Sequence, residues 1–184
     1  FEPSHVDWSP DGRFIAMTRV GLHNVTQRPS KASLAFLERE GGAWSAPRAL
    51  TPVPSDVFVT YAPVFAPSSD FVLFSQSRCS STEEINARRG YRGEDCDGDA
   101  DPSARTFALN LTGTPARPGG APILLAEAGR RGLRDVTADL GDTFPRFSPR
   151  VRKEKGRELF WVTVSSRRWF GLRPPKVRRG GQEQ

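Results

Sequence analysis

The side chains of this chain best suited to bind a metal lie in an acidic run between residues 94 and 101. Carboxylates alternate along the run, at Asp95, Asp97, Asp99 and Asp101. Closely spaced carboxylate oxygens are the ligands that calcium takes, so a calcium site here is one hypothesis. It is not an EF-hand, because a loop counted from Asp95 needs Gly in the sixth position and Glu in the twelfth, where Ala100 and Thr106 stand. The favoured interpretation is a solvated acidic turn without a metal, and no cofactor is expected.

The only two cysteines, Cys79 and Cys96, lie 17 positions apart and bracket a segment of little apolar character. This placement predicts a disulfide that closes the loop, worth about 3 kcal/mol in the chain-entropy model. A disulfide would indicate an oxidising compartment, such as a periplasm or the extracellular space. The alternative is a pair of free thiols. A zinc site is disfavoured, because no histidine lies near the two cysteines.

Residue patterns for catalysis are absent from the sequence. Its two histidines, His5 and His23, lie apart from any candidate nucleophile motif. The sequence has no Gly-x-Ser-x-Gly elbow, no Gly-x-x-x-x-Gly-Lys phosphate loop and no His-Glu-x-x-His motif. We therefore assign no catalytic residue and expect a protein that is not an enzyme.

The elements that would position these residues come from a pattern that occurs three times. Each copy has an aromatic residue, a proline two positions later and then an apolar run, with the aromatic residues and prolines at Trp8, Pro10, Phe65, Pro67, Phe147 and Pro149. In the first copy, Pro10, Asp11 and Gly12 predict a reverse turn. The run 14–17 that follows is of strand length. We expect the three aromatic residues to be core anchors, and the alternative is a stacking platform for a ligand.

The copies predict an all-β architecture of stacked repeats, because such a unit cannot bury its apolar face alone. Glycine and proline punctuate about four short strands per repeat, and no sustained helical period is present. Pro10 and Pro67 lie 57 positions apart, whereas Pro67 and Pro149 lie 82 apart, so the second repeat carries an insertion at 79–105.

The first copy resembles the repeat of TolB-type β-propellers, whose hallmark is similar to Pro-x-Trp-Ser-Pro-Asp-Gly-x-x-Ile-Ala-Phe. Residues 8–17 match it closely, and Leu50-Thr51 and Val136-Thr137 are similar to the family's blade ends. The second and third copies lack Asp-Gly, so their turns are expected to differ. The motif is structural and carries no catalytic residue. It is also similar to blades in the non-catalytic propellers of prolyl-oligopeptidase-like peptidases.

This resemblance implies an incomplete propeller of about two and a half blades. We expect one blade at 1–60, a second with the inserted loop at 61–140, and the start of a third at 141–184. A closed propeller has roughly four to eight blades. Further blades or a completing chain are therefore expected, because an open propeller leaves strand edges exposed.

The composition is that of a β-rich globular domain, with 36% hydrophobic residues and a mean hydropathy of −0.51. No apolar run approaches the ~20 residues of a membrane-spanning helix. The net charge is +6, and the most basic stretch, 146–179, also carries aromatic residues. Nucleic-acid binding is disfavoured, because these aromatics lie in strand-like runs and are better explained as core. Plain solvated charge is favoured, and an acidic partner or an anionic envelope surface is the alternative.

Together these features predict a non-enzymatic TolB-like propeller segment that acts as a protein-interaction scaffold in the bacterial envelope or in a secreted protein. The inserted loop 79–105 is the expected recognition element. Two alternatives stay open. One is the propeller of a prolyl-oligopeptidase-like peptidase whose catalytic domain lies outside these residues, and the other is a metal-stabilised structural module.

Overall fold

The computed structural model describes residues 2–23, 29–50, 59–78, 103–112, 117–118, 121–128 and 142–166. Within these ranges every regular element is a β-strand, which confirms the expected all-β class. The described residues include no helix of the length and apolar character needed to cross a membrane.

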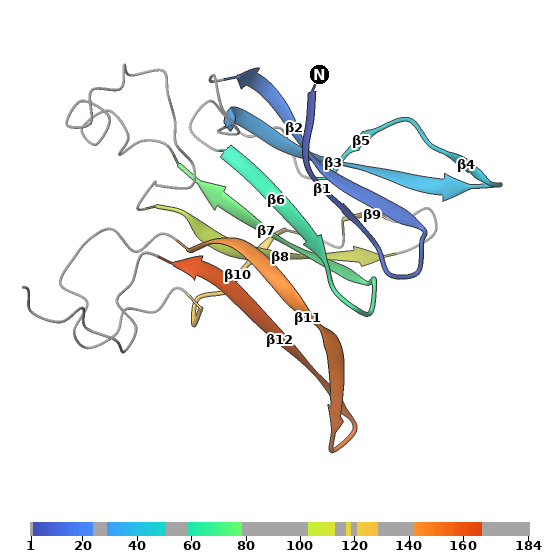
Figure 1. The fold of residues 1–184 in the computed structure, drawn as a ribbon, viewed down its shortest axis with the longest axis vertical. Helices are drawn as coiled ribbons and strands as arrows, with labels where there is room; N and C mark the ends of the chain where they lie inside the picture. The colour runs from blue at the N-terminus through green and yellow to red at the C-terminus, as the bar shows by residue number, and fades with distance from the viewer. Residues whose placement is uncertain are drawn as a thin grey trace, which may run out of the picture.

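The strands form three antiparallel sheets in chain order (Figure 1). The first sheet contains β1 (Glu2–Trp8), β2 (Phe14–His23), β3 (Pro29–Glu40), β4 (Ala43–Trp44) and β5 (Arg48–Ala49). The second contains β6 (Val59–Phe65), β7 (Phe71–Ser77), β8 (Arg105–Thr112), β9 (Arg117–Pro118) and β10 (Ile123–Leu124). The third is a single hairpin of β11 (Asp142–Glu154) and β12 (Arg157–Ser166).

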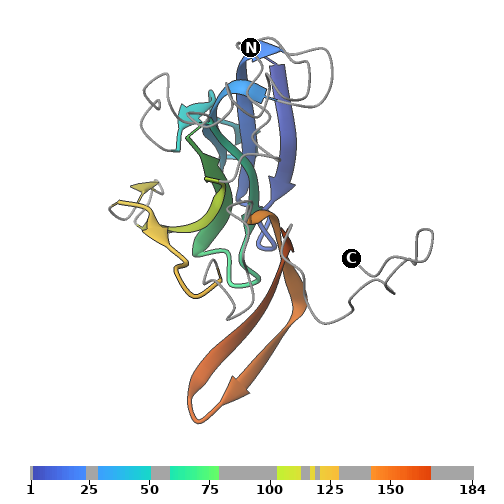
Figure 2. The same cartoon turned by 90° about the vertical axis from the view of Figure 1, so that its left-hand side faces the viewer.

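The sheets follow one another as the blades of an open propeller. The first strand of the middle sheet, β6, contacts β1, β2 and β3 of the first sheet and β11 of the third. Every residue of β6 is buried as a result. The far end of the β11–β12 hairpin extends away from the other two sheets (Figure 2) and is exposed on both strands. Among the described residues, the middle blade is thus covered on both sides, whereas the outer blades are each covered on one.

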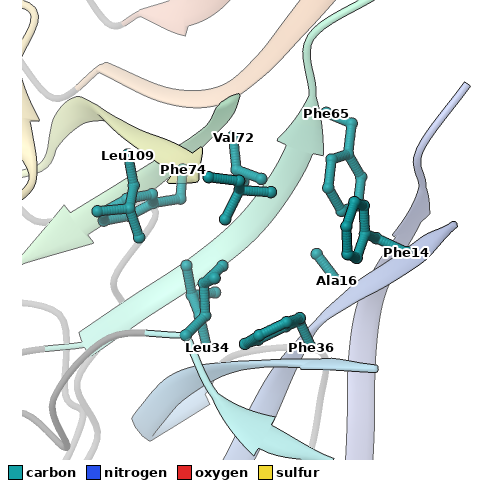
Figure 3. Close-up of a cluster of buried hydrophobic side chains, with 10 residues drawn as sticks. Phe14, Ala16, Leu34, Phe36, Phe65, Val72, Phe74 and Leu109 are labelled. Carbon is teal, nitrogen blue, oxygen red and sulfur yellow. The ribbon is translucent and has the colours of Figure 1, made fainter. Parts of the chain in front are cut away.

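The main core fills the space between the first two sheets (Figure 3). Alternate residues of β2 face the second sheet, as the period of two in a strand requires, and Phe14 stacks against Phe65 with ring centroids 6.2 Å apart. Both are buried together with Ala16, Leu34, Phe36, Leu50, Val72, Phe74, Leu109 and Leu111. Each large side chain buried here stabilises the fold by about 1.5–3 kcal/mol.

The first two hairpin turns have the same backbone geometry, so the prediction that they differ was wrong. In the first turn the N–H of Gly12 donates to the carbonyl of Ser9, and in the second the N–H of Ser69 donates to that of Ala66, both at 2.9 Å. Gly12 has φ of 71° and Ser69 has φ of 65°. The serine is held in this left-handed conformation within the packed pair of turns, because its Oγ accepts the N–H of Asp11 at 3.2 Å.

The third copy forms no turn at its proline, which corrects a second prediction. Pro149 lies inside β11, and the chain reverses at Lys155 and Gly156, with φ of 50° and 75°. A two-residue turn with both φ values positive matches the twist of the flanking strands, and glycine at the second position favours it. The turn chemistry of Lys-Gly therefore determines the register of this hairpin.

The three motif aromatics are not equally buried, so their expected role as core anchors holds for only part of the set. Phe65 is 4% exposed and Phe147 is half-buried, but Trp8 is 55% exposed. Phe65 faces the first sheet, whereas Trp8 makes an edge contact with Trp44, at 5.3 Å between ring centroids, on an otherwise open face. Burial of the motif aromatic thus depends on a preceding blade.

Candidate functional site at the mouth of the first strands

A bulge occurs at the same place in the first strand of each blade. The register shifts after Ser4 in β1, after Tyr61 in β6 and after Thr143 in β11. The following residue has positive φ in each case, 45° at His5, 52° at Ala62 and 49° at Phe144. Such a backbone costs about 1–3 kcal/mol for a residue other than glycine, so the surrounding structure must hold it in place.

Hydroxyl groups from the preceding blade hold two of these bulges. The N–H of Ala62 donates to Oγ1 of Thr18, and the N–H of Phe144 donates to Oγ of Ser75, both at 3.0 Å. Thr18 and Ser75 are fully buried, so each bond satisfies a buried donor that the bulge leaves without a partner in its own ladder. This hydroxyl bond is a repeated junction between consecutive blades.

The bulges bring three rings together from three different strands, and we call this group the mouth cluster: His5, Tyr61 and Phe144. The centroid of the His5 ring lies 6.4 Å from Tyr61 and 5.6 Å from Phe144, and those of Tyr61 and Phe144 lie 5.9 Å apart. Tyr61 is fully buried, whereas Phe144 is half-buried. The cluster is therefore a small aromatic surface whose outer members remain accessible.

His5 is the titratable member of the mouth cluster. Burial lowers the pKa of its imidazole below the usual 6.5, and the positive charge of Arg146 lowers this pKa further. Its Nδ1 lies 3.0 Å from Oγ of Ser4. The ring is therefore neutral at pH 7 and can pack against apolar groups, while the exposed Arg146 beside it offers a cation. Aromatic surface beside a cation suits recognition of a peptide with apolar and acidic side chains.

The inserted segment leaves and rejoins the fold next to this cluster. The N–H of Arg78, just after β7, donates to Oγ of Ser103, just before β8, at 2.8 Å. Ala104 accepts the N–H of Asp142, the first residue of β11, at 3.2 Å. Asp142 is two residues from Phe144, so the base of the insertion adjoins the mouth cluster. The described structure thus positions both ends of the predicted recognition loop.

The predicted metal and disulfide residues lie outside the described residues. These are Asp95, Asp97, Asp99, Asp101, Cys79 and Cys96. Within the described ranges no group of three or more His, Cys, Asp or Glu side chains could hold a metal ion. The calcium site and the disulfide remain predictions.

The structural roles of Thr18 and Ser75 were missed by the sequence analysis. They are equivalent because Ser4 pairs with Thr18 across the first hairpin and Tyr61 pairs with Ser75 across the second. A hydroxyl four residues into each second strand, after Phe14 and Phe71, is the signal that could have found them. It is a weak signal, because serine and threonine are frequent at exposed strand positions.

Comparison with known proteins gives distant likenesses among solved structures. No protein-family model and no curated protein matches the sequence. The chain is similar to the solved structure of a protein from Agrobacterium tumefaciens assigned as TolB, with a TM-score of 0.44 and 14% identity. The match covers 81% of this chain and 35% of that chain. A match at this level supports no inference about function.

Proposed function

We propose that this chain is a non-enzymatic propeller segment that recognises a protein partner at the mouth cluster, where the first strands of its blades meet. The inserted loop 79–105 and the mouth cluster form the binding surface together, and the bound element is an extended peptide segment with apolar and acidic side chains. The loop supplies contacts that select the partner, and the cluster supplies a preformed aromatic contact surface. Binding residues on loops held by a rigid β-scaffold are a common arrangement.

One observation carries this proposal, which is the position of the loop base. The bond between Arg78 and Ser103 closes the insertion, and the bond from Asp142 to Ala104 ties that closure to β11. Both lie at the end of the sheets where His5 and Phe144 meet. The anchoring of both ends of the insertion beside a half-buried aromatic cluster supports the proposal that the loop and the cluster bind one partner together.

We propose the bacterial envelope or the extracellular space as the location, on the strength of the predicted Cys79–Cys96 bridge. A disulfide between these residues would hold the loop in a narrow set of conformations and lower the entropic cost of binding. The intact mass of the source protein should rise by two hydrogen atoms on reduction. An unchanged mass would remove both the bridge and the argument for this location.

Partner capture by matched variants tests the binding site. The wild-type chain, a variant lacking 80–95, Arg146→Glu and Arg152→Glu are immobilised, exposed to envelope and secreted proteins of the source organism, and cross-linked. The deletion and Arg146→Glu should lose the species that wild type captures. Arg152→Glu makes the same charge change on the exposed outer part of the hairpin and should keep it.

Each variant is first checked by circular dichroism and thermal melting, so that a misfolded chain is not counted as a binding defect. Capture of the same species by the deletion variant would overturn the assignment of the loop. Capture by the deletion together with loss in Arg146→Glu would leave the cluster as the binding surface and remove the loop from it.

A further inference from the structure

Each pair of consecutive blades shares a second repeated contact in addition to the hydroxyl bond. An aromatic residue at the start of one blade's second strand contacts the motif aromatic of the next blade. Phe14 meets Phe65 with centroids 6.2 Å apart, and Phe71 meets Phe147 at 5.5 Å. The hydroxyl of the same second strand lies four residues further along. The junction therefore consists of one ring and one hydroxyl from the earlier blade.

The third hairpin carries the same pair of residues at equivalent positions. Phe147 pairs with Val162, so the residue before Val162, Trp161, is the equivalent of Phe14 and Phe71. Thr143 pairs with Ser165, so Ser165 is the equivalent of the two junction hydroxyls. These two are again four residues apart. The hairpin β11–β12 thus presents a complete ring-and-hydroxyl pair.

This pair is uncovered in the described structure. Trp161 is 62% exposed, against 3% for Phe14, and Ser165 is also exposed. Val162 and Leu159 are exposed beside it. We call this surface, formed by Trp161 and Ser165, the tail face. It has the residues of a blade junction, and no described residue covers it.

The opposite end of the molecule has the matching half. Trp8 is the equivalent of the buried Phe65, and Val6 is the equivalent of Pro63, which is buried in the second blade. Both Trp8 and Val6 are exposed, at 55% and 58%. His5 has the same left-handed backbone as Ala62, but among the described residues no hydroxyl receives its N–H. We call this surface, formed by His5, Val6 and Trp8, the head face.

We propose that the tail face of one copy of this chain binds the head face of a second copy, and that two copies close into a ring. In this junction Trp161 packs against Trp8, and Oγ of Ser165 accepts the N–H of His5. The argument is continuity, because the two junctions within the chain use the same equivalent positions, and both unfilled halves occur on one polypeptide. The inference goes beyond the proposed function and does not rest on the loop or its partner.

Closure follows from the number of blades. Each copy contributes two five-stranded sheets and the two-stranded hairpin that begins a third blade, so two copies supply six blade positions, within the roughly four to eight of a closed propeller. A head-to-tail contact closes into a ring when the rotation fits and otherwise grows into a filament. A ring of two copies would cover both exposed faces and leave no head or tail free.

The first test is the native mass of the 184-residue chain, by light scattering during size exclusion and by native mass spectrometry. The expected mass is twice the 20.3 kDa of one chain. A mass of 20.3 kDa at the highest soluble concentration would overturn the proposal. Mass that grows without limit as concentration rises would also overturn the two-copy ring.

Two variants test the head-to-tail geometry. Trp161→Asp disables the tail and Trp8→Asp disables the head, and each alone should weaken self-association by roughly 30-fold or more, as for an aromatic residue central to an interface. Mixed together they retain one intact head and one intact tail. The mixture should therefore form a one-to-one heterodimer, although neither variant dimerises alone.

A matched control and a smaller variant complete the design. Ile123→Asp places the same charge on an exposed apolar residue of β10, outside both faces, and should leave the dimer unchanged. Ser165→Ala should weaken the dimer by up to about tenfold. A dimer that persists in either tryptophan variant alone, or a mixture that stays monomeric, would overturn the head-to-tail junction.

Discussion

The middle blade and the outer blades of this chain are built from the same motif and differ mainly in what covers them. In the middle blade, the motif aromatic Phe65 is buried and every residue of β6 is inaccessible. In the first blade, the equivalent Trp8 is exposed on a strand of the same length and register. Burial at this position is therefore a property of the junction between blades and not of the blade itself.

The comparison extends to polar groups. The left-handed bulge recurs in all three blades, yet among the described residues its N–H has a hydroxyl acceptor only in the second and third, where the blade before it supplies one. Backbone geometry is thus determined within each hairpin, while its stabilisation comes from the neighbour. This difference predicts that equivalent substitutions have unequal effects in the middle and outer blades.

The largest expected difference in the loss of unfolding free energy is between Phe65→Ala and Trp8→Ala. Truncating Phe65 removes a buried ring that stacks on Phe14, and should lower the free energy of unfolding by about 3–5 kcal/mol. Trp8→Ala removes an exposed ring and should cost less than about 1 kcal/mol. Urea denaturation at a concentration where the chain is monomeric measures both. Equal losses would show that the two positions are energetically alike, contrary to the structure.

The junction hydroxyl provides the next comparison. Thr18→Val keeps the shape of the side chain but leaves the buried N–H of Ala62 without an acceptor, so the free energy of unfolding should fall by about 1–3 kcal/mol. Ser165→Ala, at the equivalent exposed position, should leave the monomer within about 0.5 kcal/mol of wild type. The same denaturation experiment compares them. A neutral Thr18→Val would mean that the bond contributes nothing to the junction.

The all-β class and the two blade motifs could be predicted because they depend on local pattern: a turn after the aromatic residue and an apolar run after the turn. The exposure of Trp8 could not be predicted from the sequence, since it depends on whether another blade covers this side chain. The motif predicted a turn at Pro149, but the chain turns at Lys155-Gly156, because that pair has better geometry for a two-residue loop. The mouth cluster could not be predicted from the sequence either, because His5, Tyr61 and Phe144 come together only through the bulges.

A third prediction compares the two similar turns. Gly12→Ser places in the first turn the residue type that occupies the second, at a φ of 71°. Steric crowding is not the obstacle, since a Cβ at Gly12 would come no closer than 4.0 Å to Nε1 of Trp8. The left-handed conformation should cost about 1–2 kcal/mol. Ser69→Gly relieves similar strain but loses the bond to Asp11, so its effect on the denaturation midpoint should be smaller.

The smallest expected effect is a pH dependence that only the first blade has, because the equivalents of His5 are Ala62 and Phe144. Burial and Arg146 lower the pKa of His5 in the folded state below its usual value of 6.5. The unfolded chain therefore binds the proton first as pH falls, and stability decreases from about pH 6.5 down to the folded-state pKa. Above pH 6.5 both states are neutral at this residue and no dependence arises from it.

Substitution of His5 by asparagine separates this titration from the backbone requirement. Asparagine tolerates positive φ, so His5→Asn should keep the bulge while removing the loss of stability below pH 6.5. His23→Asn changes the other histidine of the chain and should retain the loss. Arg146→Gln should raise the pKa of His5 toward 6.5 and shrink the effect, as followed by the imidazole chemical shifts. A pKa of 6.5 or above in the wild type would show that the mouth cluster does not desolvate this ring, and the first blade would then differ from the middle one only in its uncovered face.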